Sequence, residues 1–301
     1  MEVVILTHQF GGGWTEDKLE VMQRYFSAYA LALKNMPFAK WYVDAFAGTG
    51  QRSEIKVNSK DQFSMFEFDE TEFASIKDGS VRIALAIEPA FGKYVFNEQS
   101  KTHTAELEKL KQEFPNRKIE IRQGDANEFL QSIASTTNWK STRAAVFIDP
   151  YGMQVSWETL KALSATKAVD IALLFPTGPL TRVLTRDGDI PEEWINRIND
   201  HLGPCDWRNA VYEQTSEDDL FSNAVLKTAK TLTPEGLRQF VAKRLADIFP
   251  FVSEYQLELK NSKGATLYHL FIICANPVPA AIKLANKLAL SAMKLPSKHK
   301  R

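Results

Sequence analysis

The chain has 301 residues, of which 44% are hydrophobic and 25% charged, and its 37 basic side chains balance its 37 acidic ones. This composition is typical of a folded globular protein and excludes a disordered or fibrous chain. Its two cysteines exclude a disulfide framework or a zinc-binding cysteine cluster, and no apolar run approaches the roughly 20 residues that span a bilayer. Because the amino-terminal residues lack a signal-peptide pattern, we expect a cytoplasmic protein with no membrane association and no metal site.

The first predicted elements lead into a glycine turn. A helix is predicted over residues 15–35, with Thr15 as its N-cap, because apolar side chains recur there at steps of three and four. A short buried strand over residues 41–43 follows and ends on Asp44. The next residues, Ala47–Gly50, form a turn in which glycines allow close approach of the backbone to a ligand.

The residues of this turn indicate the type of ligand. The glycine spacing is not the G-x-G-x-x-G of dinucleotide-binding proteins, which argues against NAD and an oxidoreductase. An acid followed by F-A-G-T-G suits a ligand with a positive centre and hydrogen-bond donors, such as S-adenosylmethionine. A tight strand-to-helix turn without any ligand is the alternative.

Strands and helices then alternate along the chain. Residues 51–79 interrupt this alternation and look like an insertion. The predicted strands lie at 94–96, 119–122, 144–148 and 169–175, and the predicted helices at 81–90 (capped by Ser80), 100–114, 128–134 and 156–163. Such alternation specifies a doubly wound parallel sheet with right-handed crossovers.

The pattern loosens after residue 176. We predict helices at 191–202 and 233–248, an antiparallel hairpin of strands 252–259 and 267–274, and a last helix that begins at Pro277 or Pro279, whereas residues 207–219 have no clear assignment. A parallel sheet closed by an antiparallel hairpin is the layout of the class I methyltransferase sheet. We therefore predict one Rossmann-like α/β domain over residues 1–301, with insertions, partly helical, at about 51–79 and 177–235.

Each of the first four predicted strands ends at an acidic residue. These residues are Asp44, Glu98, Asp125 and Asp149. Single acids at strand ends are common, but four at successive strands are harder to dismiss. Because the carboxyl ends of parallel strands share one edge of the sheet, we expect these carboxylates at the edge where open α/β sheets bind ligands.

With these residues in view, the chain resembles the three-Cys-motif partner protein (TcmP) family over nearly its full length. The shared segments are D-x-F-A-G-x-G (44–50), the helix start G-S (79–80), the acid Glu98, F-I-D-P-[FY]-G (147–152), L-L-F-P-T-G (173–178), and the late segments at 244–250 and 267–271. The resemblance implies a methyltransferase-like fold, a partner protein that carries a three-cysteine motif and is suspected of radical-SAM-type chemistry, and a phage-defence or modification setting. It implies no particular substrate.

A class I methyltransferase would bind S-adenosylmethionine along the predicted strand ends. Asp44 would lie beneath the methionine part, Glu98 would accept hydrogen bonds from both ribose hydroxyls, and Asp125 would accept one from the adenine amine. The other predicted cofactor-binding residues are Phe46, Ala47, Gly48 and Gly50 of the turn and Ala126, which would pack on the adenine. The alternatives are a solvated strand-end acid for Glu98 and a helix N-cap for Asp125, and Asp125 can fill both roles at once.

The turn at residues 149–152 is the predicted catalytic segment. Methyltransferases that act on exocyclic amines carry [N/D/S]-P-P-[Y/F] here, where oxygens orient the amine and the aromatic ring stacks on the base. This chain has Asp149, Pro150 and Tyr151, but Gly152 stands at the aromatic position. The sequence therefore does not decide whether a ring stacks on a base here, or whether the substrate is a nucleobase. Tyr151 could stack from one position earlier, or pack on the following helix.

Basic side chains at two places late in the chain could contact a substrate, and the first of these lies on the predicted substrate side. Arg182 and Arg186 follow the fifth strand and could hold phosphates, or could instead pair with the acids at 187 and 189. Six Lys and Arg residues and no acids occupy residues 283–301, which could contact DNA or RNA or form a solvated tail.

Two functions remain open on the sequence. The first is methyl transfer to nucleic acid, to a base amine in particular, together with the three-Cys-motif partner. The second is a catalytically weakened docking module that binds S-adenosylmethionine or no cofactor. The altered turn at residues 149–152 favours the second, and the acids Asp44, Glu98 and Asp125 favour cofactor binding in either case.

Overall fold

The computed structural model describes residues 13–48, 79–218, 224–261 and 263–294. The predicted insertion at 51–79, apart from its last residue, lies outside the described residues. Gly50 and the end of the basic segment, from residue 295 on, also lie outside them.

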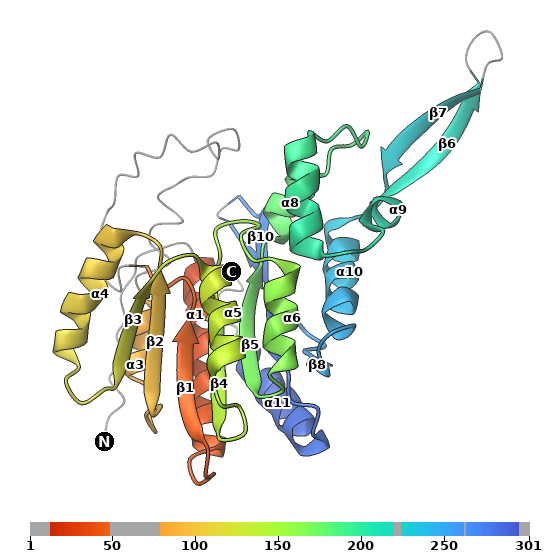
Figure 1. Ribbon diagram of the computed structural model, residues 1–301. Helices are drawn as coiled ribbons and strands as arrows, with labels where there is room; N and C mark the ends of the chain where they lie inside the picture. The colour runs from red at the N-terminus through yellow and green to blue at the C-terminus, as the bar shows by residue number, and fades with distance from the viewer. Residues whose placement is uncertain (1–12, 49–78, 219–223, 262, 295–301) are drawn as a thin grey trace.

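One mixed sheet forms the centre of the molecule, with the strand order β3-β2-β1-β4-β5-β10-β8, and β9 pairs with β10 beside this path (Figure 1). Strands β1 to β5 are mutually parallel, and β10 is antiparallel to β5. The strands are β1 (Ala39–Asp44), β2 (Lys93–Glu98), β3 (Ile119–Gln123), β4 (Thr142–Ile148), β5 (Val169–Phe175), β8 (Phe251–Val252), β9 (Leu257–Lys260) and β10 (Thr266–Cys274). This order confirms the predicted fold class, a doubly wound Rossmann-like sheet of the class I methyltransferase type.

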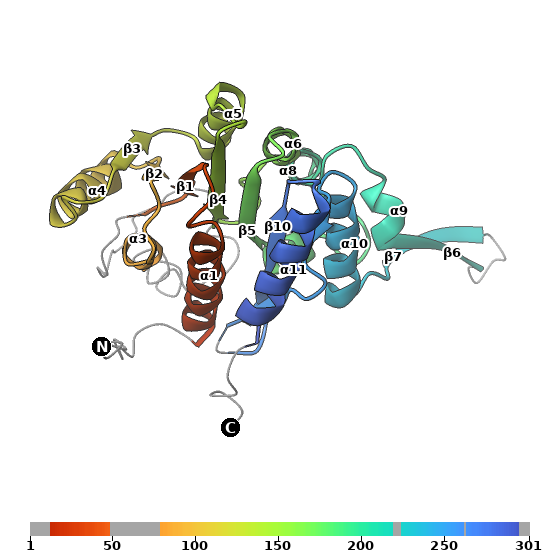
Figure 2. The same cartoon turned by 90° about the horizontal axis from the view of Figure 1, so that it is seen from below.

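Helices cover both faces of the sheet, as Figure 2 shows from below. One face packs on α1 (Gly13–Ala32), α3 (Ser80–Leu85), α4 (Lys101–Glu113) and α11 (Pro279–Ala292). The other packs on α5 (Ala126–Thr136), α6 (Trp157–Ala165), α8 (Glu192–Leu202) and α10 (Pro234–Ala246). Every residue of β5 is buried, as its sequence, apolar except for Asp170, predicts for a strand covered on both faces. None of the helices within the described residues is both long and apolar enough to cross a membrane.

The segment after β5, which we predict as an insertion, contains a β-hairpin that the sequence did not indicate. Besides α8 it comprises α7 (Thr177–Val183), α9 (Trp207–Val211) and the antiparallel pair β6 (Tyr212–Asp218) and β7 (Ala224–Lys230). The hairpin projects away from the sheet in both views (Figures 1 and 2). Its base is fixed by Lys230, whose Nζ donates to the carbonyl oxygens of Thr181 (2.7 Å) and Leu184 (2.9 Å) at the end of α7, where a cation is favourable.

Four local predictions are corrected by the structure. Thr15 lies inside α1, which begins two residues earlier, and does not cap it. Ser80 is the first residue of α3 and not its cap, because its hydroxyl donates to the buried carboxylate of Asp44 at 3.0 Å. The predicted strand 252–259 is broken into β8 and β9, and the predicted helix 81–90 ends at Leu85. The last helix begins at Pro279, one of the two starts considered.

A buried hydrogen bond joins α1 to β5 at the amino end of that strand. The Tyr25 hydroxyl donates to Oδ2 of Asp170 at 2.7 Å, and the thiol of Cys274 on β10 also bonds to this carboxyl. Burial raises the pKa of Asp170 from its ordinary 3.8 to about 6. The folded protein therefore keeps this proton at pH values where the unfolded chain has lost it.

This raised pKa predicts a pH-dependent stability. Since the folded carboxyl binds its proton more tightly, its contribution is complete below pH 3.8 and is lost as the pH rises to about 6, by up to about 3 kcal/mol. Asp170→Asn cannot ionise and should gain stability relative to the wild type by about this amount between pH 4 and pH 7. Urea unfolding of both proteins across this range measures the difference. A difference that does not change with pH would contradict the assignment.

Candidate functional site

The four predicted acids lie at one edge of the sheet, as expected from the parallel strands. Asp44 and Glu98 are the last residues of β1 and β2, and Asp149 directly follows β4. Asp125 stands two residues beyond β3 and directly before α5. The sheet therefore brings the predicted cofactor-binding and catalytic acids to neighbouring strand ends.

Asp44 is fully buried and shapes the turn that follows β1. Its Oδ1 accepts a hydrogen bond from the backbone N–H of Phe46 (3.1 Å) and its Oδ2 one from the Ser80 hydroxyl (3.0 Å). The carboxylate thus ties the turn to the start of α3. Within this turn Ala47 is buried and Gly48 has a φ of 65°, a left-handed conformation that favours glycine.

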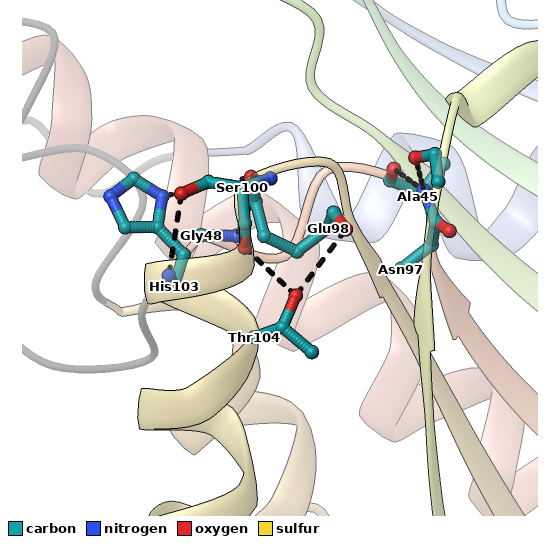
Figure 3. A network of polar contacts seen from close by, with 8 residues as sticks. Ala45, Gly48, Asn97, Glu98, Ser100, His103 and Thr104 are labelled. Carbon is teal, nitrogen blue, oxygen red and sulfur yellow. Dashed lines mark hydrogen bonds and ion pairs between the residues drawn. The ribbon is translucent and has the colours of Figure 1, made fainter.

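Glu98 joins this turn to the start of α4 (Figure 3). Its Oε2 accepts from the backbone N–H of Gly48 at 2.8 Å, and its Oε1 accepts from the backbone N–H of Ser100 at 2.9 Å. Each carboxylate oxygen has a second lone pair, so Glu98 can still accept two further hydrogen bonds. Two donors on one ligand, such as the hydroxyls of a ribose, match this capacity.

Asn97 is a residue of the site that the sequence interpretation missed. Its side-chain amide donates to the carbonyl oxygens of Ala45 (3.2 Å) and Gly124 (3.1 Å), and its backbone carbonyl oxygen accepts from the N–H of Ala47 (2.9 Å). Asn97 is 1% exposed and fixes the loops after β1 and β3 to β2. The one sequence signal was an amide directly after the apolar segment Tyr94–Phe96.

Asp125 caps the helix that follows β3. Its Oδ1 accepts from the N–H groups of Asn127 (2.8 Å) and Glu128 (3.1 Å), which confirms the N-cap considered for this residue. Asp125 itself is exposed and the adjacent Ala126 is buried. The cap orients the residue at the ligand-binding edge, and its contact with an adenine amine stays a prediction.

Asp149 forms a buried ion pair with Lys18, a residue that the sequence interpretation did not single out. The Lys18 Nζ lies 2.7 Å from Oδ2 of Asp149, and the two side chains are 0% and 10% exposed. Lys18 lies on α1 three, four and seven residues before Val21, Met22 and Tyr25, which form the buried face of that helix. A lysine on the apolar stripe of a helix was the available signal, because such a cation is rarely buried unless it is paired.

The rest of the 149–152 turn is held by neighbouring side chains. The carbonyl oxygen of Pro150 accepts from the Tyr268 hydroxyl at 3.3 Å, and the N–H of Tyr151 donates to Oε1 of Gln154 at 2.8 Å. The Tyr151 side chain is 36% exposed, and Gly152 has a φ of 62°. An aromatic residue at position 152 would be strained in this turn, so the backbone conformation disfavours the ring that exocyclic-amine methyltransferases carry at this position.

The two predicted substrate-binding arginines occupy different surroundings. Arg182 is an exposed residue on α7. It lies close enough to the Tyr268 hydroxyl to lower the pKa of that group, which burial and the nearby Asp149 carboxylate raise. Arg186 is exposed beyond the end of α7, where its carbonyl oxygen accepts from the N–H of Lys230 at the hairpin base. Among the described residues no ion pair joins Arg186 to the acids at 187 and 189, which was the alternative considered.

Two histidines near the end of β5 are buried and uncharged. His201 Nδ1 donates to the carbonyl oxygen of Val155 at 2.7 Å, and His269 Nδ1 lies 2.6 Å from the Thr177 hydroxyl. Burial lowers the pKa of each to about 4. In the part of the chain that the structure describes, no group of three or more His, Cys, Asp and Glu side chains is arranged to hold a metal ion.

Comparisons with known proteins find similar structures but no matching sequence. No protein-family model and no curated protein matches the chain. A protein of Legionella pneumophila is 13% identical, with 94% of each chain covered and a TM-score of 0.47. The O-methyltransferase from Bacillus cereus in complex with SAH is 14% identical, with 90% of this chain and 93% of that chain covered and a TM-score of 0.36. TYW2 from M. jannaschii in complex with AdoMet is 10% identical, with 90% and 77% covered and a TM-score of 0.33.

The fold assignment above rests on the strand order and not on these likenesses. The same order, with its antiparallel strand inserted beside β5, places the acidic strand ends at the ligand-binding edge.

Proposed function

We propose that this chain is a methyltransferase that uses S-adenosylmethionine and transfers the methyl group to an amine of a nucleic acid. The observation that carries the proposal is the buried Lys18–Asp149 ion pair, which stands at the same sheet edge as Glu98. Charged pairs of this kind are costly to bury and concentrate at functional sites. The proposed acceptor site lies beside Asp149, and the proposed cofactor site extends from β1 to β3.

The described residues fit the proposed cofactor. Its ribose hydroxyls and adenine amine are hydrogen-bond donors, and the carboxylates of Glu98 and Asp125 are acceptors at adjacent strand ends. Asp44 would act through the turn that it shapes, with Phe46, Ala47 and Gly48 beside the ligand, and Ala126 would contact the adenine. S-adenosylmethionine supplies a methyl group bound to a positively charged sulfur.

The Lys18–Asp149 pair gives Asp149 the role of orienting the acceptor. The Lys18 ammonium donates to Oδ2, while Oδ1 can accept a hydrogen bond from an amine of the acceptor. An amine held in this way directs its lone pair at the methyl group, and such orientation lowers the barrier of a bimolecular transfer. The carboxylate also stabilises the positive charge that develops on the attacking nitrogen.

The choice of nucleic acid as the acceptor rests on three weaker observations. The 149–152 turn resembles that of exocyclic-amine methyltransferases, and Tyr151 is exposed enough to contact a base. Arg182 lies on the same side, where a guanidinium can hold a phosphate. The resemblance to the TcmP family adds a three-Cys-motif partner protein, which we propose as a component of the active assembly.

Replacement of Asp149 tests the proposed chemistry. Asp149→Ala should lower methyl transfer from S-adenosylmethionine by at least about 100-fold, because the amine loses its orienting acceptor. The variant also removes the ion-pair partner of the buried Lys18 ammonium, so thermal unfolding must first show that it is folded. The folded variant should bind S-adenosylhomocysteine within about twofold of the wild type, since the Glu98 end of the site is unchanged. Transfer to DNA and RNA oligonucleotides that carry adenine or cytosine amines is measured with and without the three-Cys-motif partner.

The matched control for this prediction is Asp200→Ala, which removes an exposed carboxylate from α8. It should leave transfer unchanged. If Asp149→Ala transfers methyl groups at the control rate, Asp149 has no part in the reaction.

A docking subunit is the second candidate function. It is favoured by Gly152, which removes the aromatic residue from the position where exocyclic-amine methyltransferases stack on the base. This candidate predicts cofactor binding without transfer to any oligonucleotide in the assay above, even when the partner protein is present.

A further inference from the structure

We infer that His103 is a cofactor-binding residue that, together with Glu98, holds one ribose hydroxyl of the nucleoside part of the cofactor. The inference rests on the proposed use of S-adenosylmethionine and assigns to that site a residue that the sequence did not indicate. It follows from one unsatisfied buried atom and its distance from a carboxylate oxygen.

His103 lies in the first turn of α4, next to the acid that ends β2 (Figure 3). Its backbone N–H donates to the Ser100 side chain, the N-cap of this helix, at 3.4 Å. The turn also carries Thr104, whose hydroxyl donates to the carbonyl oxygen of Ser100 at 2.8 Å. These two contacts fix the backbone that presents the imidazole to Glu98.

The imidazole has one buried nitrogen without a hydrogen bond. His103 Nδ1 is buried and has no hydrogen-bond partner among the described residues, although the side chain as a whole is 28% exposed. Its nearest charged neighbour is Oε1 of Glu98, at 3.6 Å. This distance is too long for a hydrogen bond, and a buried polar atom left unsatisfied is uncommon enough to indicate a missing partner.

A single hydroxyl oxygen about 2.8 Å from each atom would satisfy both Nδ1 of His103 and Oε1 of Glu98. The protons decide the direction of the two bonds. A carboxylate only accepts, so the hydroxyl must donate to Glu98, and its lone pair must then accept from an N–H on Nδ1. The arrangement thus requires a proton on Nδ1 of His103.

A ribose suits this arrangement better than a ligand with one hydroxyl. Oε1 of Glu98 would take one hydroxyl jointly with His103, and Oε2, which is bonded to the N–H of Gly48, has a lone pair for the second. With His103 in place, the affinity of the site would depend more strongly on one ribose hydroxyl than on the other, whereas the carboxylate alone would not distinguish the two.

The test is a cycle that combines variants of His103 with changes in the ligand. Calorimetric titrations would measure the affinities of the wild type, His103→Ala and His103→Asn for S-adenosylhomocysteine and for its 2′-deoxy and 3′-deoxy analogues. Thr102→Ala, an exposed neighbour on the same helical turn, is the matched control. Binding is the readout, so the methyl acceptor need not be known.

His103→Ala should bind S-adenosylhomocysteine about 10-fold more weakly than the wild type, and His103→Asn should recover most of this loss because its amide places a donor near the position of Nδ1. Removal of the hydroxyl that His103 contacts should cost the wild type about 30-fold and His103→Ala about 5-fold, because the alanine variant has already lost one of the two bonds. Removal of the other hydroxyl should cost both proteins the same factor.

The outcomes separate this inference from the proposed function. Equal losses in the wild type and His103→Ala for both analogues would mean that His103 only supports the loop, and would overturn the inference while leaving the cofactor site in place. Failure of the wild type to bind S-adenosylhomocysteine would contradict the proposed function itself. Weakened binding in Thr102→Ala equal to that in His103→Ala would also overturn the inference, because it would trace the effect to the helix.

Discussion

Lys18→Met is expected to lower the free energy of unfolding by about 3–5 kcal/mol, because it leaves the Asp149 carboxylate buried without its counter-charge. Met has nearly the volume of Lys, so little of this loss should come from a cavity. The Lys18 side chain is 0% exposed and that of Asp149 10% exposed, so water cannot easily replace the ammonium. Chemical denaturation of the two proteins at neutral pH measures the effect.

A double variant distinguishes a lost charge partner from lost packing. Lys18→Met combined with Asp149→Asn removes both charges and should regain most of the stability, because no uncompensated carboxylate remains. Arg24→Met is the control, since Arg24 lies on the same helix in a partly exposed pair with Glu20 and should cost about 0–1 kcal/mol. If the double variant is no more stable than Lys18→Met, the ion pair is not what the lysine contributes.

The second large effect is expected at Glu98. Glu98→Gln should weaken the binding of S-adenosylhomocysteine by about 100-fold or more, because an amide nitrogen would then face donors where the carboxylate offers acceptors. The amide nitrogen of the Glu98→Gln side chain would also face either the N–H of Gly48 or the N–H of Ser100, and one of these two hydrogen bonds would be lost. The link between the turn after β1 and the start of α4 should therefore weaken as well.

The control for this variant lies on the next helix. Glu108→Gln alters an exposed acid of α4 that pairs with Lys111, and it should bind S-adenosylhomocysteine as the wild type does. Thermal unfolding of both variants shows whether Glu98→Gln is folded at the titration temperature. A folded Glu98→Gln protein with wild-type affinity would remove Glu98 from the cofactor site.

The sheet could be predicted because its strands carry strong local signals. β4 and β5 are nearly unbroken apolar segments, and acids mark the ends of β1, β2 and β4, so the strand ends and their common edge followed from one-dimensional patterns. The N-cap role of Asp125 is also local, since its partners are two and three residues away.

What could not be predicted depends on contacts between distant segments. Lys18 and Asp149 are 131 residues apart in the sequence, and no local pattern around either residue indicates its partner. Ser80 has the right residue type for a cap, but a buried carboxylate 36 residues earlier takes its hydroxyl. The β6–β7 hairpin carries no regular alternation of apolar and polar residues, and it projects from the body of the molecule (Figure 1).

The measurement that tests the central claim most directly is calorimetric titration of the wild-type chain with S-adenosylmethionine and S-adenosylhomocysteine, with Glu98→Gln as the reference. We predict micromolar binding of both compounds by the wild type and no measurable binding by the variant. Absence of binding to either compound by the folded wild-type chain would contradict a cofactor site at the carboxyl ends of β1 to β3.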